Sequence, residues 1–333
     1  MRAIFLCNRE KDVRRVWTDA VIERVQALVS LKKTVYSTED ILAAPADFAD
    51  VEIVFSTWGM PKLTEEQIAL CLPRLRCVFY AAGTVQPFAR PFLARGIKVF
   101  SAWAANAVPV AEYTMAQILL STKGFFAQTR LMQAQRLADA KARSKEMRGN
   151  YGARVGLIGC GMIGSMVAER LKAYNLEVVA FDPFLSAERA AALGVTRVSL
   201  EELFATCLVV SNHLANNEKT KGMLNGELFE KLVPYATFLN TGRGAQVVEG
   251  DLVRVLRTRP DLTAVLDVTY PEPPEADHPF YTLENCFLTP HIAGSLGDEV
   301  VRMAEYMAEE LAAYLSGRPS RFEVSEKMLE TMA

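Results

Sequence analysis

The segment that most restricts how this chain can fold is a glycine-rich turn between a predicted strand and a predicted helix. Residues Arg154–Ile158 form a short apolar run, and Gly159, Gly161 and Gly164 follow it with the spacing GxGxxG. A helix is predicted over Met162–Tyr174. The first glycine allows a tight turn, the second lets the backbone approach a pyrophosphate, and the third lets the helix pack closely on the strand. The triplet alone is weakly specific, but its place between strand and helix predicts a dinucleotide-binding turn.

The next strand, predicted over Glu177–Phe181, ends directly before Asp182. A carboxylate at this position can accept hydrogen bonds from both ribose hydroxyls of NAD and would repel the 2′-phosphate of NADP. The amides of Met162 and Ile163 would face the pyrophosphate, because a helix N-terminus favours anions. Asp182 also begins an Asp-Pro pair, which is an ordinary turn sequence. The strand, the glycines and the acid together favour NAD as the cofactor.

The chain has 333 residues, which exceeds what one hydrophobic core usually organises, so two domains are expected. Short apolar runs alternate with helical patterns, and this alternation requires parallel pairing of the strands. In the first part, strands are predicted at Ala3–Cys7, Ile53–Thr57, Cys77–Ala81 and Lys98–Ser101, and helices at Val13–Leu31, Thr64–Leu72 and Gln86–Arg95. In the second part, strands are predicted at Arg154–Ile158, Glu177–Phe181, Leu208–Asn212, Thr237–Asn240, Ala264–Val268 and Phe287–Thr289. The predicted fold class is therefore α/β, with six strands of the second part forming a doubly wound nucleotide-binding sheet.

Two further helical segments complete the predicted domain organisation. The charged stretch Arg136–Arg148 is interpreted as a solvated helical arm or loop. The final helix, Asp298–Leu315, is expected to return to the first domain. That return would make the first domain discontinuous, with residues 1–104 and 294–333 on either side of a nucleotide-binding domain at 105–293.

Composition and charge narrow the classes of partner. The chain has 37 basic and 39 acidic side chains, a net charge of −2, so no basic field favours nucleic acid and an anionic substrate needs a local cation. The N-terminal apolar stretch is too short for a secretory signal, and no stretch is long enough to cross a membrane. The six cysteines form no CxxC pair, and no metal site is predicted. Cys7, Cys77 and Cys207 lie in apolar strand-like runs, where a reduced thiol is a small hydrophobic group, and this favours a reducing cytoplasm.

The chain holds only three histidines, so candidates for an acid–base group at neutral pH are few. His278 lies in a proline-rich loop, where a solvated position is favoured. His213 ends a predicted strand and could either line the cofactor cleft or cap the strand. His291 follows the last predicted strand, at the edge where ligands bind in open α/β sheets, and is the best-placed base.

Two charged residues follow neighbouring strands of the same predicted sheet. Arg243 lies in the turn that begins at Thr241, and its planar guanidinium suits a carboxylate bidentately. Glu272 follows the next strand and could orient and charge a histidine. A surface arginine in a glycine-rich turn and a solvated loop glutamate are the alternatives for each residue alone. Three such groups on successive strand ends favour a shared site.

These segments together resemble the D-isomer-specific 2-hydroxyacid dehydrogenase family. The resemblance rests, in chain order, on Asn106–Glu112 (NAVPVAE), Gly159–Gly164, Asp182, Asn240–Gly244 (NTGRG), Asp267–Pro273 (DVTYPEP) and Thr289–Gly294 (TPHIAG). It implies a flavodoxin-like, discontinuous substrate-binding domain around a Rossmann NAD-binding domain, and a homodimer. It also implies that Arg243, Glu272 and His291 lie in the active site.

The resemblance further implies hydride transfer between NAD(H) and a small 2-hydroxy or 2-oxo acid, such as glyoxylate, hydroxypyruvate or a phosphoglycerate-like acid. Arg243 and the backbone amides of Ala82 and Gly83 are expected to bind the substrate carboxylate. His291 would exchange the proton of the 2-hydroxyl, and Glu272 would stabilise the imidazolium that forms. No nucleic acid, membrane or metal partner is implied.

Cofactor contacts are expected from Thr241, from His213, and from Asp267 at the nicotinamide edge. The sequence departs from the family at Gln86-Pro87, where an Asp-Asn pair is usual, and at Ala215, where proline is usual. The formate dehydrogenase branch pairs its histidine with glutamine, so Glu272 argues against that branch. An NAD-sensing binding protein or corepressor on the same fold is the alternative from a different class.

Overall fold

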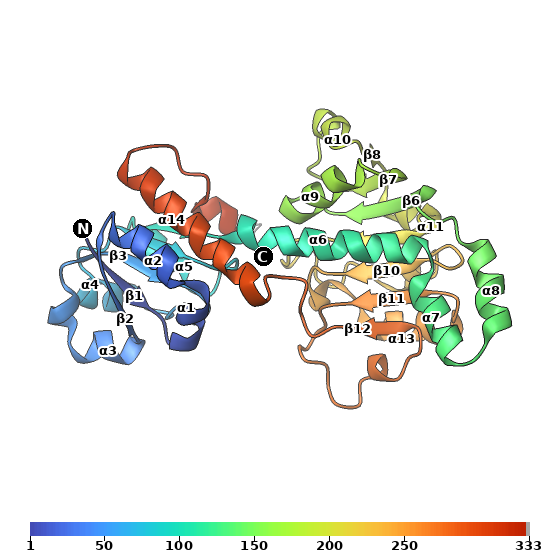
Figure 1. The fold of residues 1–333 in the computed structure, drawn as a ribbon, viewed down its shortest axis with the longest axis horizontal. Coiled ribbons are helices and arrows are strands. Elements are labelled where there is room, and N and C mark those ends of the chain that lie inside the picture. The colour runs from blue at the N-terminus through green and yellow to red at the C-terminus, as the bar shows by residue number, and fades with distance from the viewer. Residues whose placement is uncertain (331–333) are drawn as a thin grey trace. The chain divides into compact units, whose positions relative to one another are not determined.

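The computed structural model describes residues 1–330, which divide into two compact units (Figure 1). Unit 1 comprises Met1–Ala107 and the chain from Ser295 onward, and unit 2 comprises Val108–Gly294. The helix α6, Trp103–Thr122, contributes residues to both. The last part of the predicted first domain, residues 331–333, lies outside the described residues. The substrate-binding role of unit 1 stays a prediction.

Unit 1 is built on a sheet with the strand order β13-β5-β4-β3-β1-β2. Its strands are β1 (Arg2–Leu6), β2 (Ser30–Tyr36), β3 (Val51–Ser56), β4 (Cys77–Tyr80), β5 (Lys98–Ser101) and β13 (Glu323–Val324), and only β13 is antiparallel to its neighbour. The order of the first five strands is that of flavodoxin-like doubly wound sheets. Phe55, Phe79 and Phe100 stack across three neighbouring strands in the core. The strands of a parallel sheet are buried on both faces, and for this reason they appear in the sequence as apolar runs.

Helices cover both faces of this sheet (Figure 1). One group is α1 (Glu10–Val16), α2 (Asp19–Gln26) and α14 (Val301–Leu315), and the other is α3 (Thr38–Ala43), α4 (Glu65–Cys71) and α5 (Ala89–Ala94). The buried side of α14 includes Met303, Met307 and Leu311, which pack in the core of unit 1.

The predicted helix over Val13–Leu31 is wrong. The chain forms two helices there, separated at Trp17 and Thr18, and then enters β2. β2 lies at the edge of the sheet and carries two lysines, and most of its side chains are at least partly exposed. A polar edge strand of this kind lacks the apolar run that marks a buried strand, which is why the sequence did not reveal it.

Unit 2 contains a seven-stranded parallel sheet with the order β12-β11-β10-β9-β6-β7-β8. The strands are β6 (Tyr151–Ile158), β7 (Asn175–Phe181), β8 (Thr196–Arg197), β9 (Val209–Asn212), β10 (Thr237–Asn240), β11 (Thr263–Leu266) and β12 (Cys286–Leu288). Counted from β6, the order places the fourth strand beside the first, as in the Rossmann fold. The predicted α/β class with two doubly wound sheets is confirmed. The exposed two-residue strand β8 was not predicted.

The helices of unit 2 cover two faces of its sheet (Figure 1). α9 (Met162–Leu171) and α10 (Ala187–Leu193) share an apolar cluster with α6, and α11 (Leu200–Thr206), α12 (Gly226–Phe229) and α13 (Glu249–Thr258) share another. The charged stretch forms α8 (Leu137–Glu146), which follows α7 (Phe125–Gln133) and is mostly exposed. Among residues 1–330, no helix has both the length and the apolar character that a membrane crossing requires.

Candidate functional site

The turn between β6 and α9 has the shape that a bound pyrophosphate requires. Gly159 has φ +88°, and a Cβ there would lie 2.9 Å from the carbonyl oxygen of His213. A Cβ on Gly164 would lie 2.0 Å from the carbonyl oxygen of Gly159, so this glycine is needed for packing. A Cβ on Gly161 would meet nothing within 4 Å, so the protein itself leaves open space at this position. The amides of Met162 and Ile163 begin α9 without a side-chain cap.

Asp182 is held in place by two backbone amides at the end of β7. Its Oδ2 accepts a hydrogen bond from Cys160 N at 2.7 Å, and its Oδ1 accepts one from Phe184 N at 2.8 Å. Because each carboxylate oxygen has a second lone pair, both oxygens can still accept a ribose hydroxyl. The hydrogen bond from Phe184 N is that of a turn formed by the Asp-Pro pair. Asp182 can therefore form this turn and also accept the ribose hydroxyls.

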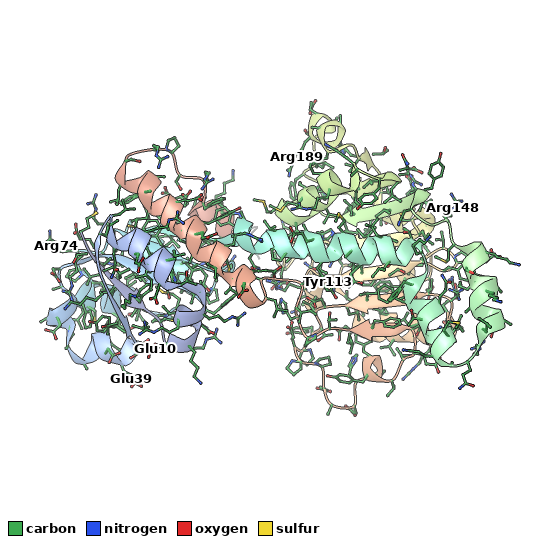
Figure 2. All side chains as sticks on the ribbon, viewed as in Figure 1. Glu10, Glu39, Arg74, Tyr113, Arg148 and Arg189 are labelled. Atoms are coloured by element: carbon green, nitrogen blue, oxygen red, sulfur yellow. The ribbon has the colours of Figure 1, made fainter. Side chains whose placement is uncertain are left out.

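Arg189, on α10, is a neighbour of this turn that sequence reasoning missed (Figure 2). Its Nη2 donates to Cys160 O at 2.8 Å and to Ser165 Oγ at 2.9 Å. These two hydrogen bonds connect α10 to the glycine-rich turn and stabilise its conformation. The sequence carried no signal for this contact, because Arg189 lies on an otherwise ordinary exposed helix.

We predict that wild-type protein binds NADH far more tightly than NADPH. Hydrogen bonds to a charged group contribute about 1.5–3 kcal/mol, so Asp182→Ser should weaken NADH binding roughly 10- to 150-fold. Repulsion of the 2′-phosphate should add to the discrimination in the wild type. Fluorescence titration with both cofactors measures this preference. Equal affinities of the wild type for NADH and NADPH would contradict the assignment of Asp182.

Three fully buried amide side chains connect the ends of β9 and β10. Asn212 Nδ2 donates to Asn240 Oδ1 at 3.0 Å and to Gln246 Oε1 at 2.6 Å. Gln246 Oε1 also accepts from Arg243 N at 3.2 Å, and Gln246 Nε2 donates to Leu214 O at 2.8 Å. The network fixes the backbone that carries Arg243. Sequence reasoning missed it because the bonded residues lie 28 to 34 positions apart.

Arg243 lies in the turn after β10, where its Nη1 donates to Gly242 O at 2.8 Å. Burial lowers the pKa of Arg243, and the nearby Glu272 opposes that shift. The guanidinium remains a cation at neutral pH, since arginine is not deprotonated in proteins. Beside it, Thr241 Oγ1 is 3.2 Å from Thr114 Oγ1 on α6, so the predicted cofactor contact Thr241 is tied to a helix.

His291 and Glu272 lie against each other in unit 2. The distance between His291 Nδ1 and Glu272 Oε1 is 2.6 Å, and the two side chains are 46% and 40% exposed. This bond occupies Nδ1, so the other ring nitrogen, Nε2, is the one left for an acid–base role. His291 has φ 54°, a left-handed conformation that is uncommon for histidine and needs a surrounding structure that enforces it.

Asp267 enforces the turn that carries His291. Its Oδ1 accepts from Thr289 Oγ1 at 2.6 Å and Ile292 N at 2.9 Å, and its Oδ2 accepts from Ala293 N at 2.9 Å. Thr289 Oγ1 is also 3.1 Å from the hydroxyl of Tyr113, which lies midway along α6 (Figure 2). Asp267 is buried and bonded on both oxygens. Its observed contacts hold the His291 turn, and contact with the nicotinamide stays a prediction.

The other two histidines do not lie in contact with this pair. His213 is buried after β9, with Nε2 2.9 Å from Ser211 Oγ, and its Nδ1 has no partner among residues 1–330. His278, predicted to be a solvated loop residue, is only partly exposed: its side chain is 19% exposed and its ring packs 4.5 Å from that of Phe280. Aromatic packing within the loop covers it.

His213 predicts a pH dependence of stability. Burial lowers the pKa of His213 to about 4, below the ordinary value of 6.5. Between these values the unfolded chain binds a proton at this residue that the folded chain does not, so the contribution of His213 to stability falls as the pH falls. From pH 7 to pH 5 this contribution should fall by about 2 kcal/mol, whereas Glu249, whose pKa burial raises to about 7, shifts the stability in the opposite direction. Urea unfolding of wild type and His213→Gln checks this, because the variant should lose about 2 kcal/mol less over the same range.

Ala82 and Gly83 follow β4 in unit 1. Their carbonyl oxygens accept from Ser101 Oγ at 2.9 and 2.6 Å, whereas their amides have no acceptor among residues 1–330. Substrate binding by these amides stays a prediction. Nearby, Gln86, a departure from the family pattern, donates from Nε2 to Leu329 O. This contact ties the loop after β4 to the C-terminal segment.

The strand order and the glycine-rich turn of unit 2 define it as a Rossmann-type dinucleotide-binding domain. Residues 115–293 match the family model described as the NAD binding domain of D-isomer specific 2-hydroxyacid dehydrogenase. The chain belongs to this family, and NAD is its cofactor. The predicted membership is thereby confirmed.

Individual relatives show how wide the family is. The chain is 32% identical to a D-3-phosphoglycerate dehydrogenase of Archaeoglobus fulgidus over 71% of this chain and 44% of the relative. It is also 32% identical to a formate dehydrogenase of Chaetomium thermophilum over 82% of this chain and 76% of the relative. A phosphoglycerate oxidoreductase from Rhizobium etli has the same fold, with a TM-score of 0.81 at 20% identity over 98% and 99% of the two chains. The chain spans about half the length of the phosphoglycerate dehydrogenases that it matches.

Proposed function

We propose that this protein is an NAD-dependent dehydrogenase that transfers a hydride between NAD(H) and a small 2-hydroxy or 2-oxo acid of the D series. The observation that carries the proposal is the 2.6 Å contact between His291 Nδ1 and Glu272, in the same unit as the cofactor turn. A histidine held by a carboxylate at one nitrogen, with the other nitrogen free, is the arrangement of a general acid–base.

In the oxidative direction, Arg243 binds the substrate carboxylate through its planar fork. His291 Nε2 accepts the proton of the 2-hydroxyl, and Glu272 stabilises the positive ring that results. In the reductive direction, the protonated ring returns that proton to the 2-oxo oxygen. Bound NAD supplies the hydride chemistry at its nicotinamide. Asp267 takes no proton in this scheme and keeps the His291 turn in place.

We also propose a cytoplasmic homodimer. All six cysteines are free, which suits a reducing compartment. Apolar side chains are exposed on the segment of α7 and α8, including Phe125, Met132 and Leu137. Exposed apolar residues that gather on one segment favour an interface between copies of the chain.

The test is an NADH-oxidation assay against a panel of 2-oxo acids. The panel contains glyoxylate, hydroxypyruvate and a phosphorylated hydroxypyruvate as candidate 2-oxo acids. Formate with NAD⁺ tests the activity that the names of the formate dehydrogenase relatives give. We expect turnover with at least one 2-oxo acid and none with formate, because Glu272 rather than an amide holds His291. Tight NADH binding without turnover of any acid would instead favour an NAD-sensing protein.

A further inference from the structure

The loop that presents Glu272 is irregular, and its internal hydrogen bonds include Thr269 Oγ1 to Pro271 O at 2.9 Å and His278 N to Glu275 O at 2.9 Å. This Glu272 loop, residues 269–280, has no strand and only the start of a short 3₁₀ turn at Pro279. At its beginning, Gly244 packs so closely that a Cβ would lie 2.0 Å from the backbone of Thr269. Glu272 itself is 40% exposed and contacts His291 from an irregular segment. Its position therefore depends on whatever anchors the loop on either side.

One buried carboxylate contacts both sides of the Glu272 loop. Glu249 is the first residue of α13, and its Oε1 accepts a hydrogen bond from Tyr270 N at 2.8 Å. Its Oε2 is 3.6 Å from His278 Nε2. The Glu249 and His278 side chains are only 11% and 19% exposed. Tyr270 precedes Glu272 by two residues and His278 follows it by six, so Glu249 bridges the two sides of the loop.

The hydrogen bonds of His278 determine which ring nitrogen faces Glu249. Its Nδ1 accepts a hydrogen bond from Phe280 N at 3.3 Å. A neutral imidazole that accepts at Nδ1 carries its proton at Nε2. In that neutral form His278 presents an N–H toward the Glu249 carboxylate at 3.6 Å, which is an electrostatic contact and not a hydrogen bond.

Burying the Glu249 carboxylate costs folding free energy, which suggests that the residue has a function. Burial raises the pKa of Glu249 to about 7, and the bond from Tyr270 opposes that rise. The amide that it binds belongs to the Glu272 loop and not to the first turn of α13. Buried acids with strongly shifted pKa values gather at functional sites.

We propose that Glu249 is a positioning residue, which fixes the Glu272 loop through Tyr270 N and His278 and thereby holds Glu272 against His291 Nδ1. This inference rests on the proposed function, because it assigns Glu249 to the same acid–base pair. Glu249 touches no reacting atom and acts through Glu272. Loss of the anchor displaces Glu272 and leaves His291 without its partner.

The experiment compares Glu249→Ala, Glu249→Gln and the control Asp251→Asn at pH 8, which is above the Glu249 pKa of about 7. Asp251 lies in the same helical turn, but its Oδ2 binds Gly226 N at 2.8 Å, outside the loop. We expect Glu249→Ala to lower kcat roughly 10- to 100-fold with NADH affinity unchanged, since small displacements of catalytic groups have effects of this size. Glu249→Gln keeps an acceptor for Tyr270 and loses the carboxylate facing His278, so its effect should be intermediate. Asp251→Asn should behave as wild type.

Two measurements that do not need turnover accompany the kinetics. Hydrogen exchange of residues 269–280 should accelerate in Glu249→Ala and stay slow in the control. The ¹⁵N resonances of His291, assignable because the chain has three histidines, should lose the signature of the bond to Glu272. If wild type turns over no acid, the proposed function fails while these two readouts still test the anchor. The inference is overturned if hydrogen exchange of residues 269–280 is the same in Glu249→Ala as in wild type. It is also overturned if this exchange becomes faster while the ¹⁵N signature of His291 and kcat stay as in wild type. His278→Ala provides a second variant should Glu249→Ala not fold.

Discussion

Replacing His291 with glutamine should slow turnover of the 2-oxo acid by about 10²- to 10⁴-fold, the usual contribution of general acid–base catalysis. The ring is 46% exposed and hydrogen-bonded at Nδ1, so its Nε2 is the group lost to the reaction. NADH affinity and thermal stability should change little, because a side chain with this exposure contributes little to a hydrophobic core. Steady-state kinetics, NADH titration and thermal unfolding measure the three quantities.

Two further variants distinguish the effect of losing the base from the effect of straining the backbone at position 291. His291 has φ 54°, and asparagine tolerates this conformation better than glutamine does. His291→Asn should therefore be as slow as His291→Gln with less effect on stability. Glu272→Gln should keep some activity with an altered pH profile, since an amide stabilises the charged ring less well. A His291→Gln variant that turns over normally, or that changes only NADH affinity, would remove His291 from catalysis.

Replacing Arg243 with lysine should lower kcat/KM for the 2-oxo acid roughly 10- to 150-fold, although the charge is kept. Lysine cannot form the two parallel hydrogen bonds of a guanidinium with a carboxylate, and charge-assisted bonds contribute about 1.5–3 kcal/mol. NADH affinity should remain close to that of wild type, because no contact of Arg243 with the glycine-rich turn is seen among residues 1–330. Steady-state kinetics and NADH titration check this prediction. An equal loss of NADH binding would make Arg243 a cofactor or structural residue.

A matched variant tests whether Arg243 acts through its position. Gln246 fixes the backbone amide of Arg243 but has no free polar atom directed at a ligand. Gln246→Leu should lower stability, since it leaves the buried amide of Asn212 short of a partner. If Gln246→Leu reduces kcat/KM as strongly as Arg243→Lys without loss of stability, the backbone and not the guanidinium carries the effect.

Local sequence was sufficient where the physical signal is local. The parallel strands β6, β9 and β10 each contain a short buried apolar run, such as Val209-Val210 in β9 and Phe238-Leu239 in β10, because both of their faces are covered. The spacing of Gly159, Gly161 and Gly164 marked the turn after β6. Position at the ends of neighbouring strands was enough to place Arg243, Glu272 and His291 at one edge of one sheet. The polar edge strand β2 was not predicted, because its mostly exposed residues contain no apolar run.

Only the tertiary structure decided how these side chains are held. The bond of Asp267 to the His291 turn joins residues 25 to 26 positions apart, and that of Glu249 to Tyr270 joins residues 21 positions apart. The amides Asn212, Asn240 and Gln246 read in sequence as ordinary polar residues near turns. Hydrogen bonds are directional and short, so a pattern of polarity along the chain cannot specify which donor meets which acceptor. Burial against apolar neighbours is less directional, and the sequence by itself therefore determined the layers of the fold, whereas packing decided the contacts that orient His291.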